Sequence, residues 1–201
     1  MTKPALTQTP IAPLIANRWS GRAFDAQRDL AHSDLIALLE AARWAPSCYG
    51  EQPWRFIVWQ KSIDHAKWQL AFNCLANANQ VWAKTAPLLM LCCAHQIFSH
   101  NASPNRWSEY DSGAASENLC LQATHLGLMA HQMGGFDADA IRTSFSIPDD
   151  YMPMAMLVVG YPAPAETLGE ETLVQRELAA RMRRPLDSTF FAGTWGQGIQ
   201  S

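Results

Sequence analysis

Two arginine clusters near opposite ends of the chain have the composition of a phosphate site. One is RWSGR over residues 18–22, and the other is RMRR over residues 181–184. Guanidinium groups match phosphate oxygens in pairs and a serine hydroxyl adds a donor, so either cluster could bind a phosphate. Taken singly, the first cluster is better explained as a solvated turn, and the second as charge at the end of the last helix. Spacing alone does not show that they meet.

The stretch RWAPSCYGEQPWRF, residues 43–56, contains a loop that is fixed at both ends. Pro46 and Pro53 restrict their own φ and favour an extended conformation for the preceding Ala45 and Gln52. A loop held in this way loses less conformational entropy when it binds a ligand. The residues predict either a binding loop or a stiff corner between a helix and a strand.

Gly134 and Gly135 follow a long apolar segment. Without side chains, they would let backbone N–H groups approach a flat ligand closely. A simple helix C-cap accounts for the pair equally well. The sequence has neither a G-x-x-x-x-G-K-[ST] loop nor a G-x-G-x-x-G turn after a strand, so it lacks the two common glycine-rich nucleotide motifs.

Cysteine and histidine residues raise two further possibilities. Cys48, beside Ser47, could be the nucleophile of a cysteine hydrolase, but no G-x-S-x-G elbow surrounds it and the sequence identifies no base. The residues that a metal site would draw on are Cys92, Cys93, His95, His125 and His131. Zinc requires about four ligands in a recognisable spacing, which these do not form. We interpret them as core cysteines and surface histidines and expect no metal.

Composition and charge exclude several classes of function. The 201 residues suit a single domain over 1–201, and the net charge of -3 with a pI near 6.0 offers no basic field for nucleic acid. Five cysteines at irregular spacing, and a start without a cationic segment and long apolar run, predict a reduced, cytoplasmic protein. No apolar stretch approaches the roughly 18 residues that a membrane span requires.

Hydrophobic periodicity predicts an α+β domain with several helices around a modest sheet. In the first half we expect a helix from about residue 33 to the 43–56 stretch, a strand over 56–59, a helix over 64–84 capped by Asp64, and a doubly covered strand over 87–94. In the second half we expect a lid-like loop over 98–110, a buried helix over 112–131, and a helix over 137–145 capped by Asp137. These are followed by a turn over 148–153, a strand over 154–160, and a last helix from Glu170 to Arg183.

Together these segments resemble the FMN-dependent nitroreductase family. The resembling stretches are RWSGRAFD (18–25), EAARWAPSCYGEQPWRF (40–56), NQVWAKTAPLLM (79–90), DSGAASENLCLQATHLGL (111–128), MGGFD (133–137), IPDDYMPMAMLVVGYP (147–162), and RRPLDS with TWG near the end. They occur in the family's order and cover almost the whole chain. The resemblance implies a mainly antiparallel central sheet surrounded by helices, in an intertwined homodimer with two FMN molecules at the subunit interface.

The resemblance also implies an activity. NAD(P)H would pass a hydride to flavin N5 and leave, and a nitroaromatic, a quinone or a similar small-molecule acceptor would then take the electrons in a ping-pong scheme. The cofactor carries the chemistry, so no catalytic side chain is expected. A cation near flavin N1 and C2=O favours reduction, and Arg22 is the candidate. The alternative is a flavin-binding or sensing protein without efficient NAD(P)H turnover.

The resemblance assigns cofactor contacts to three groups of residues. Contacts to the phosphate, ribityl chain and pyrimidine edge fall to Arg18, Trp19, Ser20, Arg22, Arg181 and Arg183, with Arg184 open as an alternative in the second cluster. The loop that would reach the FMN of the partner subunit contains Pro46, Ser47, Cys48 and Gly50. The segment facing flavin N5 and O4 contains Met133, Gly134 and Gly135, with Asn79 beside it. Where the family pattern A-P-S-x-x-N-x-Q-P-W has Asn, this chain has Gly50.

Overall fold

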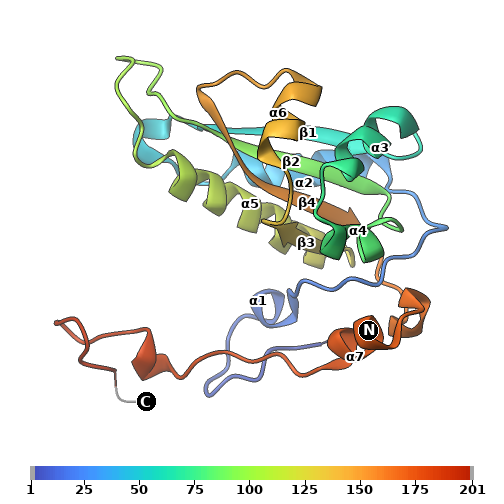
Figure 1. Cartoon of the computed structure of the whole chain (residues 1–201). Coiled ribbons are helices and arrows are strands. Elements are labelled where there is room, and N and C mark those ends of the chain that lie inside the picture. Colours follow the sequence, from blue (N-terminus) through green and yellow to red (C-terminus); the bar gives the residue numbers. More distant parts are fainter. Residues whose placement is uncertain (1–2, 200–201) are drawn as a thin grey trace.

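The computed structural model describes residues 3–199 and contains a four-stranded antiparallel sheet in the order β1-β2-β4-β3 (Figure 1). The strands are β1 (Trp54–Gln60), β2 (Leu88–His95), β3 (Met129–Met133) and β4 (Tyr151–Gly160). The register pairs Phe56 with Cys92 and Leu89 with Val158. The predicted mixed fold with an antiparallel sheet is confirmed.

Strand β2 is central, as its uninterrupted apolar run predicts. Leu89, Leu91 and Cys93 belong to the core on one face, whereas the alternate residues Leu88 and Met90 belong to the core on the other face. This division follows from the two-residue period of a strand, which sends successive side chains to opposite faces. The sheet therefore needs a helical layer on each side.

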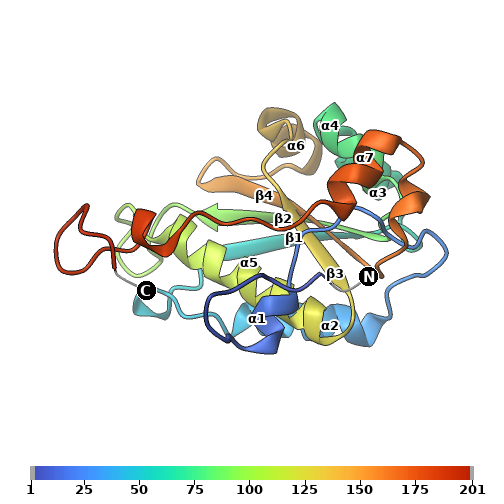
Figure 2. The ribbon, with the colours of Figure 1, turned by 90° about the horizontal axis from the view of Figure 1, so that it is seen from below.

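Two layers of helices cover the sheet (Figures 1 and 2). One face is covered by α2 (His32–Arg43) and α5 (Ser108–His125), and the other by α3 (His65–Asn73), α4 (Asn77–Ala83) and α6 (Ala138–Phe145). Asp64 caps α3 by accepting a hydrogen bond from the Lys67 backbone N–H at 3.0 Å, and Asp137 caps α6 through the N–H groups of Asp139 and Ala140. Both predicted caps are confirmed.

The predicted helix over 112–131 is wrong at both ends. Helix α5 begins at Ser108 and stops at His125, because Gly127 adopts φ +72°. The Leu128 N–H donates to the Ala123 carbonyl and the Gly127 N–H to the Thr124 carbonyl, which is a Schellman motif. Residues 129–133 then form β3, so the strand carries His131, which was assigned to the helix.

Three other predicted boundaries move. The helix expected over 64–84 is two helices, because the Ala76 N–H leaves the helical ladder and donates to the Gly135 carbonyl at 2.9 Å. Strand β4 begins within the turn expected over 148–153. The last helix, α7 (Glu171–Leu178), ends before the second arginine cluster, so 181–184 lies in extended chain.

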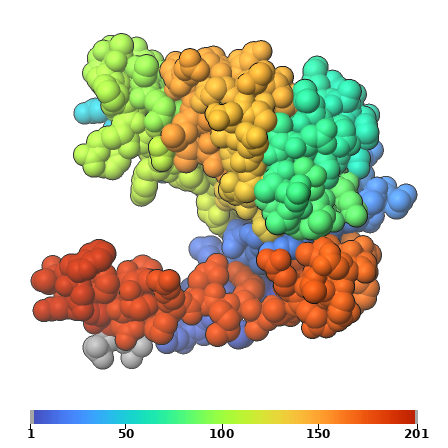
Figure 3. Space-filling view, in the orientation of Figure 1, coloured from blue at the N-terminus to red at the C-terminus, as the bar shows by residue number. Residues whose placement is uncertain are grey.

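The N-terminal arm and the segment around α7 lie side by side below the sheet domain (Figure 1). Helix α1 (Pro13–Asn17) and the arm before it run beside α7 and the segment that follows it (Figures 1 and 2). Beyond α7 the chain extends as a long segment with one short 3₁₀ helix (Leu186–Ser188), and a deep recess separates this segment from the main body (Figure 3). Within residues 3–199, no helix is long and apolar enough to cross a bilayer.

Candidate functional site

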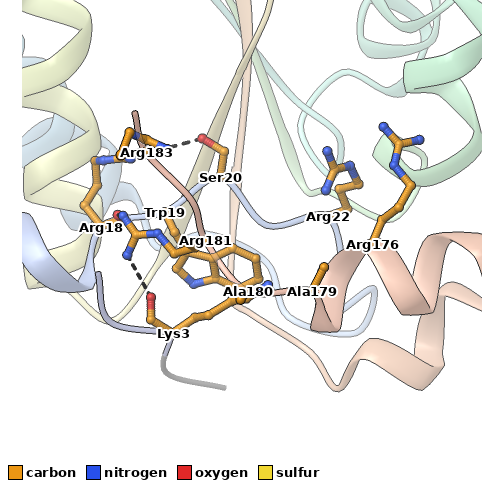
Figure 4. Close-up of a pocket in the computed structure, with 10 residues that line it drawn as sticks. All are labelled: Lys3, Arg18, Trp19, Ser20, Arg22, Arg176, Ala179, Ala180, Arg181 and Arg183. Carbon is orange, nitrogen blue, oxygen red and sulfur yellow. Dashed lines mark hydrogen bonds between the residues drawn. The ribbon is translucent and has the colours of Figure 1, made fainter. Parts of the chain in front are cut away.

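The two arginine clusters meet at one cavity between the arm, the 18–22 segment and the end of α7 (Figure 4). Its volume is about 230 Å³. The lining residues are Lys3, Arg18, Trp19, Ser20, Arg22, Arg176, Ala179, Ala180, Arg181 and Arg183. Arg184, the alternative in the second cluster, is not among them.

Positive charge dominates this cavity although the chain as a whole is acidic. Six of its lining residues are Lys or Arg. In Figure 4, Arg22 and Arg176 lie on one side, and Arg18, Arg181 and Arg183 lie on the other. Burial lowers the pKa of Arg22, and neighbouring Arg176 adds to the effect. Like charges gathered this closely favour an anionic ligand.

Glu177 fixes the backbone of the 18–22 segment through hydrogen bonds to its carboxylate. It is 2% exposed, and its carboxylate accepts hydrogen bonds from the Arg22 N–H at 2.8 and 3.0 Å and from the Ala23 N–H at 3.2 Å. The Arg22 guanidinium lies 3.8 Å from the same carboxylate. The hydrogen-bonding capacity of the Glu177 carboxylate is thus largely used by the backbone of the 18–22 segment.

Arg181 makes its strongest contacts to backbone rather than to the cavity. Its Nη1 donates to the carbonyls of Lys3 and Ala16 at 2.7 Å each, and its Nη2 donates to the Arg18 carbonyl at 2.8 Å. Arg183 is exposed, and its Nη1 donates to the Met182 carbonyl. Arg181 therefore fastens the N-terminal arm to the 18–22 segment and also adds charge at the cavity.

On the remaining side, Arg18 contacts both a hydroxyl and a carboxylate. Its Nη1 lies 3.4 Å from the Ser20 hydroxyl oxygen, and its Nε lies 3.3 Å from a carboxylate oxygen of Glu117 on α5. The Glu117 side chain is about half exposed, so this ion pair is weakened by solvent.

His131 supports the 18–22 segment from the sheet. Its Nδ1 donates to the Gly21 carbonyl at 2.9 Å, since a carbonyl can only accept, and its ring lies 4.6 Å from the Trp82 ring. Burial lowers the pKa of His131 to about 4, and the charges of Arg22 and Arg18 act in the same direction. The imidazole is therefore neutral near pH 7 and adds no charge to the cavity.

The predicted group that contains Met133, Gly134 and Gly135 forms a compact turn at the end of β3. The Asn79 side-chain amide donates to the Gly135 carbonyl at 2.9 Å, and Met133 is buried in the core. A Cβ atom on Gly135 would lie 2.9 Å from Asn79 Nδ2, whereas one on Gly134 would meet nothing within 4 Å. Gly134 thus exposes its backbone to the surroundings, and Gly135 is required for close packing.

The predicted loop that contains Pro46, Ser47, Cys48 and Gly50 lies apart from the cavity, near the start of α5. The Cys48 N–H donates to the buried carboxylate of Asp111 at 2.9 Å, and the Ser47 hydroxyl accepts from the Gln52 N–H at 3.0 Å. Gly50 has φ +67° and lies exposed, as does Pro46. These contacts hold the loop in one shape.

One conformation predicted for this loop is wrong. Gln52 has φ +50° instead of an extended backbone, and Tyr49 has φ +54°. The loop closes on itself through the bond from the Gln52 N–H to the Ser47 hydroxyl, which turns the chain sharply before Pro53. A left-handed conformation in such residues costs free energy and persists where surrounding contacts impose it.

Sequence reasoning missed Lys3, Arg176, Glu177 and the role of His131. Glu177 lies four residues after Leu173, and these two are the buried residues of α7. An acidic residue on the apolar stripe of a helix was therefore a usable signal, because buried carboxylates need partners. Lys3 gave no such signal, since its position depends on contacts with residues far away in the sequence.

The fold and cavity define an α+β protein with a cation-lined cavity, and comparison with known proteins shows its family. The nitroreductase family profile matches residues 15–161, so the chain belongs to the nitroreductase family. A solved structure described as an oxidoreductase containing FMN is 34% identical, with a TM-score of 0.89 over 96% of both chains.

Two further proteins are similar to this chain. A Methanothermobacter thermautotrophicus protein, provisionally named as an NADH dehydrogenase/NAD(P)H nitroreductase, is 28% identical over 79% of this chain and 80% of its own. The major NAD(P)H-flavin oxidoreductase of Aliivibrio fischeri is 28% identical over 51% of this chain and 44% of its own.

Proposed function

We propose that the protein is an FMN-dependent oxidoreductase that takes electrons from NAD(P)H and passes them to a small-molecule acceptor such as a nitroaromatic or a quinone. The observation that carries the proposal is the meeting of the two arginine clusters at one cavity. Family membership and the names of the similar proteins support it.

The residues present fit a phosphorylated flavin. The cavity offers several guanidinium groups and the Ser20 hydroxyl, and the nearby buried carboxylate of Glu177 accepts hydrogen bonds from backbone N–H groups. A phosphate would offset the cost of holding these cations together. Arg18, Ser20 and Arg183 would hold the phosphate end, and the open Gly134 backbone suits the flat ring.

When bound, FMN would accept a hydride from NAD(P)H and then pass the electrons to the acceptor, which is a ping-pong scheme. The chain's own contribution is to bind, orient and tune. Arg22 would stabilise negative charge on the reduced ring, because its backbone is fixed by Glu177 and its guanidinium is only partly exposed. Neutral His131 would keep the 18–22 segment in place without competing for the phosphate.

We propose further that the active form is a homodimer. The segment after α7 leaves the body with large apolar side chains exposed, including Met182 at 74% and Trp195 at 89%. Exposed side chains of this kind on an extended segment suit burial against a second copy. The fixed loop with Ser47 and Gly50 would then reach the cofactor of the partner subunit.

A reducing, cytoplasmic environment completes the proposal. All five cysteines are free, and four of them are buried: Cys74, Cys92, Cys93 and Cys120. Burial raises the pKa of Cys92 to about 11, so this thiol stays protonated and unreactive. Core thiols of this kind are typical of proteins that fold without disulfides.

The test is the visible spectrum of the purified protein before and after addition of NAD(P)H under nitrogen. We expect a flavin band that bleaches with NADH or NADPH and returns when a nitroaromatic or quinone is added. A protein that takes up no FMN would refute the proposal. Bound FMN that is bleached by dithionite but never by NAD(P)H would favour the alternative, a flavin-binding or sensing protein.

A further inference from the structure

Lys3 brings a cation from the N-terminal arm to the wall of the arginine cavity (Figure 4). Its ammonium group donates to the backbone carbonyl of Glu177 and lies 4.7 Å from the centre of the Trp19 ring. An ammonium has three N–H donors, and the Glu177 carbonyl uses one of them. The remaining donors are available to a ligand in the cavity.

The position of Lys3 is fixed by contacts at both ends of the residue. Arg181 donates to the Lys3 carbonyl at 2.7 Å, and the Ala5 N–H donates to the Ala16 carbonyl at 2.8 Å, so the arm folds back on α1. The cation–π contact with Trp19 orients the side chain. These contacts hold the Lys3 side chain in a fixed position at the cavity wall.

Electrostatics disfavour this placement in the absence of an anion. Burial lowers the pKa of Lys3, and the charges of Arg181 and Arg22 act in the same direction, whereas Glu177 opposes them. A cation placed beside other cations is stabilised when a dianionic phosphate binds among them. The hydrogen bond to the neutral Glu177 carbonyl needs no positive charge, so of the structural contacts of the Lys3 ammonium only the cation–π contact with Trp19 uses it.

We propose that the N-terminal arm completes the phosphate site and that Lys3 is a phosphate-binding residue, selecting the phosphorylated form of the flavin. This inference rests on the proposed function. It assigns a ligand contact to a segment that precedes residues 15–161, the part matched by the family profile.

The experiment compares the Kd values of FMN and riboflavin, which differ only in the phosphate, for the full-length apoprotein. Lys3→Met keeps an unbranched apolar side chain and removes the charge that lies over Trp19, and Lys3→Arg keeps the charge. Lys84→Met, at an exposed lysine, is the matched control. Fluorescence quenching of the flavin gives each Kd at low and high salt.

In Lys3→Met we expect FMN to bind about tenfold more weakly, the loss typical of one charge-assisted hydrogen bond, while riboflavin binding changes less than about twofold. Lys3→Arg should stay within about threefold of wild type for FMN, and the salt dependence of FMN binding should become shallower in Lys3→Met. If Lys3→Met lost equal affinity for the two flavins, or lost none for either, the inference about Lys3 would be overturned while the proposed function would stand. A wild-type protein that binds neither flavin would overturn the proposed function as well.

Discussion

Glu177 and Arg22 are joined through backbone rather than mainly through their charges. The Arg22 N–H lies 2.8 and 3.0 Å from the two carboxylate oxygens of Glu177, whereas the guanidinium is 3.8 Å away. The two residues are separated by 155 positions in the sequence. The carboxylate therefore shapes the segment that carries the arginines and leaves the Arg22 side chain free to face a ligand.

Replacing Glu177 by Ala should lower both stability and FMN affinity. Two backbone N–H groups, the partly buried one of Arg22 and the buried one of Ala23, would lose their acceptor, at a cost of up to roughly 1–3 kcal/mol each. Urea unfolding measures the loss, and flavin titration measures the affinity. Glu166→Ala, at an exposed position, is the control and should change neither. A Glu177→Ala protein as stable as wild type would contradict the assignment.

His131 predicts a pH dependence of stability with a definite sign. Its pKa is about 4 in the folded protein and near 6.5 in the unfolded chain, so the unfolded chain binds more protons between these values. Stability should therefore fall as the pH drops from 6.5 toward 4, by at most about 3 kcal/mol from this residue.

A pair of variants isolates that contribution. His131→Gln retains a donor for the Gly21 carbonyl but does not titrate, so its stability relative to wild type should improve as the pH is lowered. His125→Gln, at an exposed histidine, serves as the control and should follow the wild-type profile. Urea denaturation at pH 7 and pH 5 provides the comparison. Parallel profiles for wild type and His131→Gln would rule out a buried neutral imidazole.

Local sequence patterns were sufficient to predict much of the fold, but not where its helices and strands begin and end. The apolar run of β2 and the caps Asp64 and Asp137 act within a few residues, and all three were predicted. The extension of α5 through residue 131 was predicted wrongly because the apolar spacing continues past Gly127. The left-handed glycine was the stronger signal, since it ends a helix whatever pattern follows.

The site was predictable in composition but not in arrangement. The arginine clusters at 18–22 and 181–184 were identified from residue type, yet their meeting depends on the packing of the N-terminal arm against α7. Lys3 and Glu177 enter through contacts that span more than 150 residues. No periodicity records such contacts, so one sequence alone could not place them.

Gly134 and Gly135 should respond differently to alanine. In Gly135→Ala the new Cβ would lie 2.9 Å from Asn79 Nδ2 and would displace the amide from the Gly135 carbonyl, costing about 1 kcal/mol. Gly134→Ala meets open space, so its effect on the free energy of unfolding should stay within about 0.5 kcal/mol. If the Gly134 backbone faces the flavin, Gly134→Ala should weaken FMN binding even though it leaves the free energy of unfolding nearly unchanged.

A double-mutant cycle tests the stated cause of the Gly135 effect. In an Asn79→Ala background the clash partner and the hydrogen bond are both gone, so adding Gly135→Ala should cost much less than it does alone. Thermal or urea unfolding of the four proteins gives the coupling. Additive losses would show that the amide of Asn79 is not what makes the glycine necessary.

Gly50 offers a test of the loop that is proposed to reach the partner's cofactor. It has φ +67°, and a Cβ there would meet nothing within 4 Å. Asn tolerates this left-handed conformation better than other non-glycine residues, so Gly50→Asn should cost less than about 1 kcal/mol of folding stability, whereas Gly50→Ala should cost about 1–2 kcal/mol.

Gly50→Asn also introduces the side chain expected at this position from the family pattern A-P-S-x-x-N. We therefore expect slower FMN release from Gly50→Asn than from wild type, followed by flavin fluorescence after dilution, with Gly50→Ala as the control for backbone strain. Equal release from the Asn and Ala variants would mean that the loop makes no side-chain contact with the cofactor at this position.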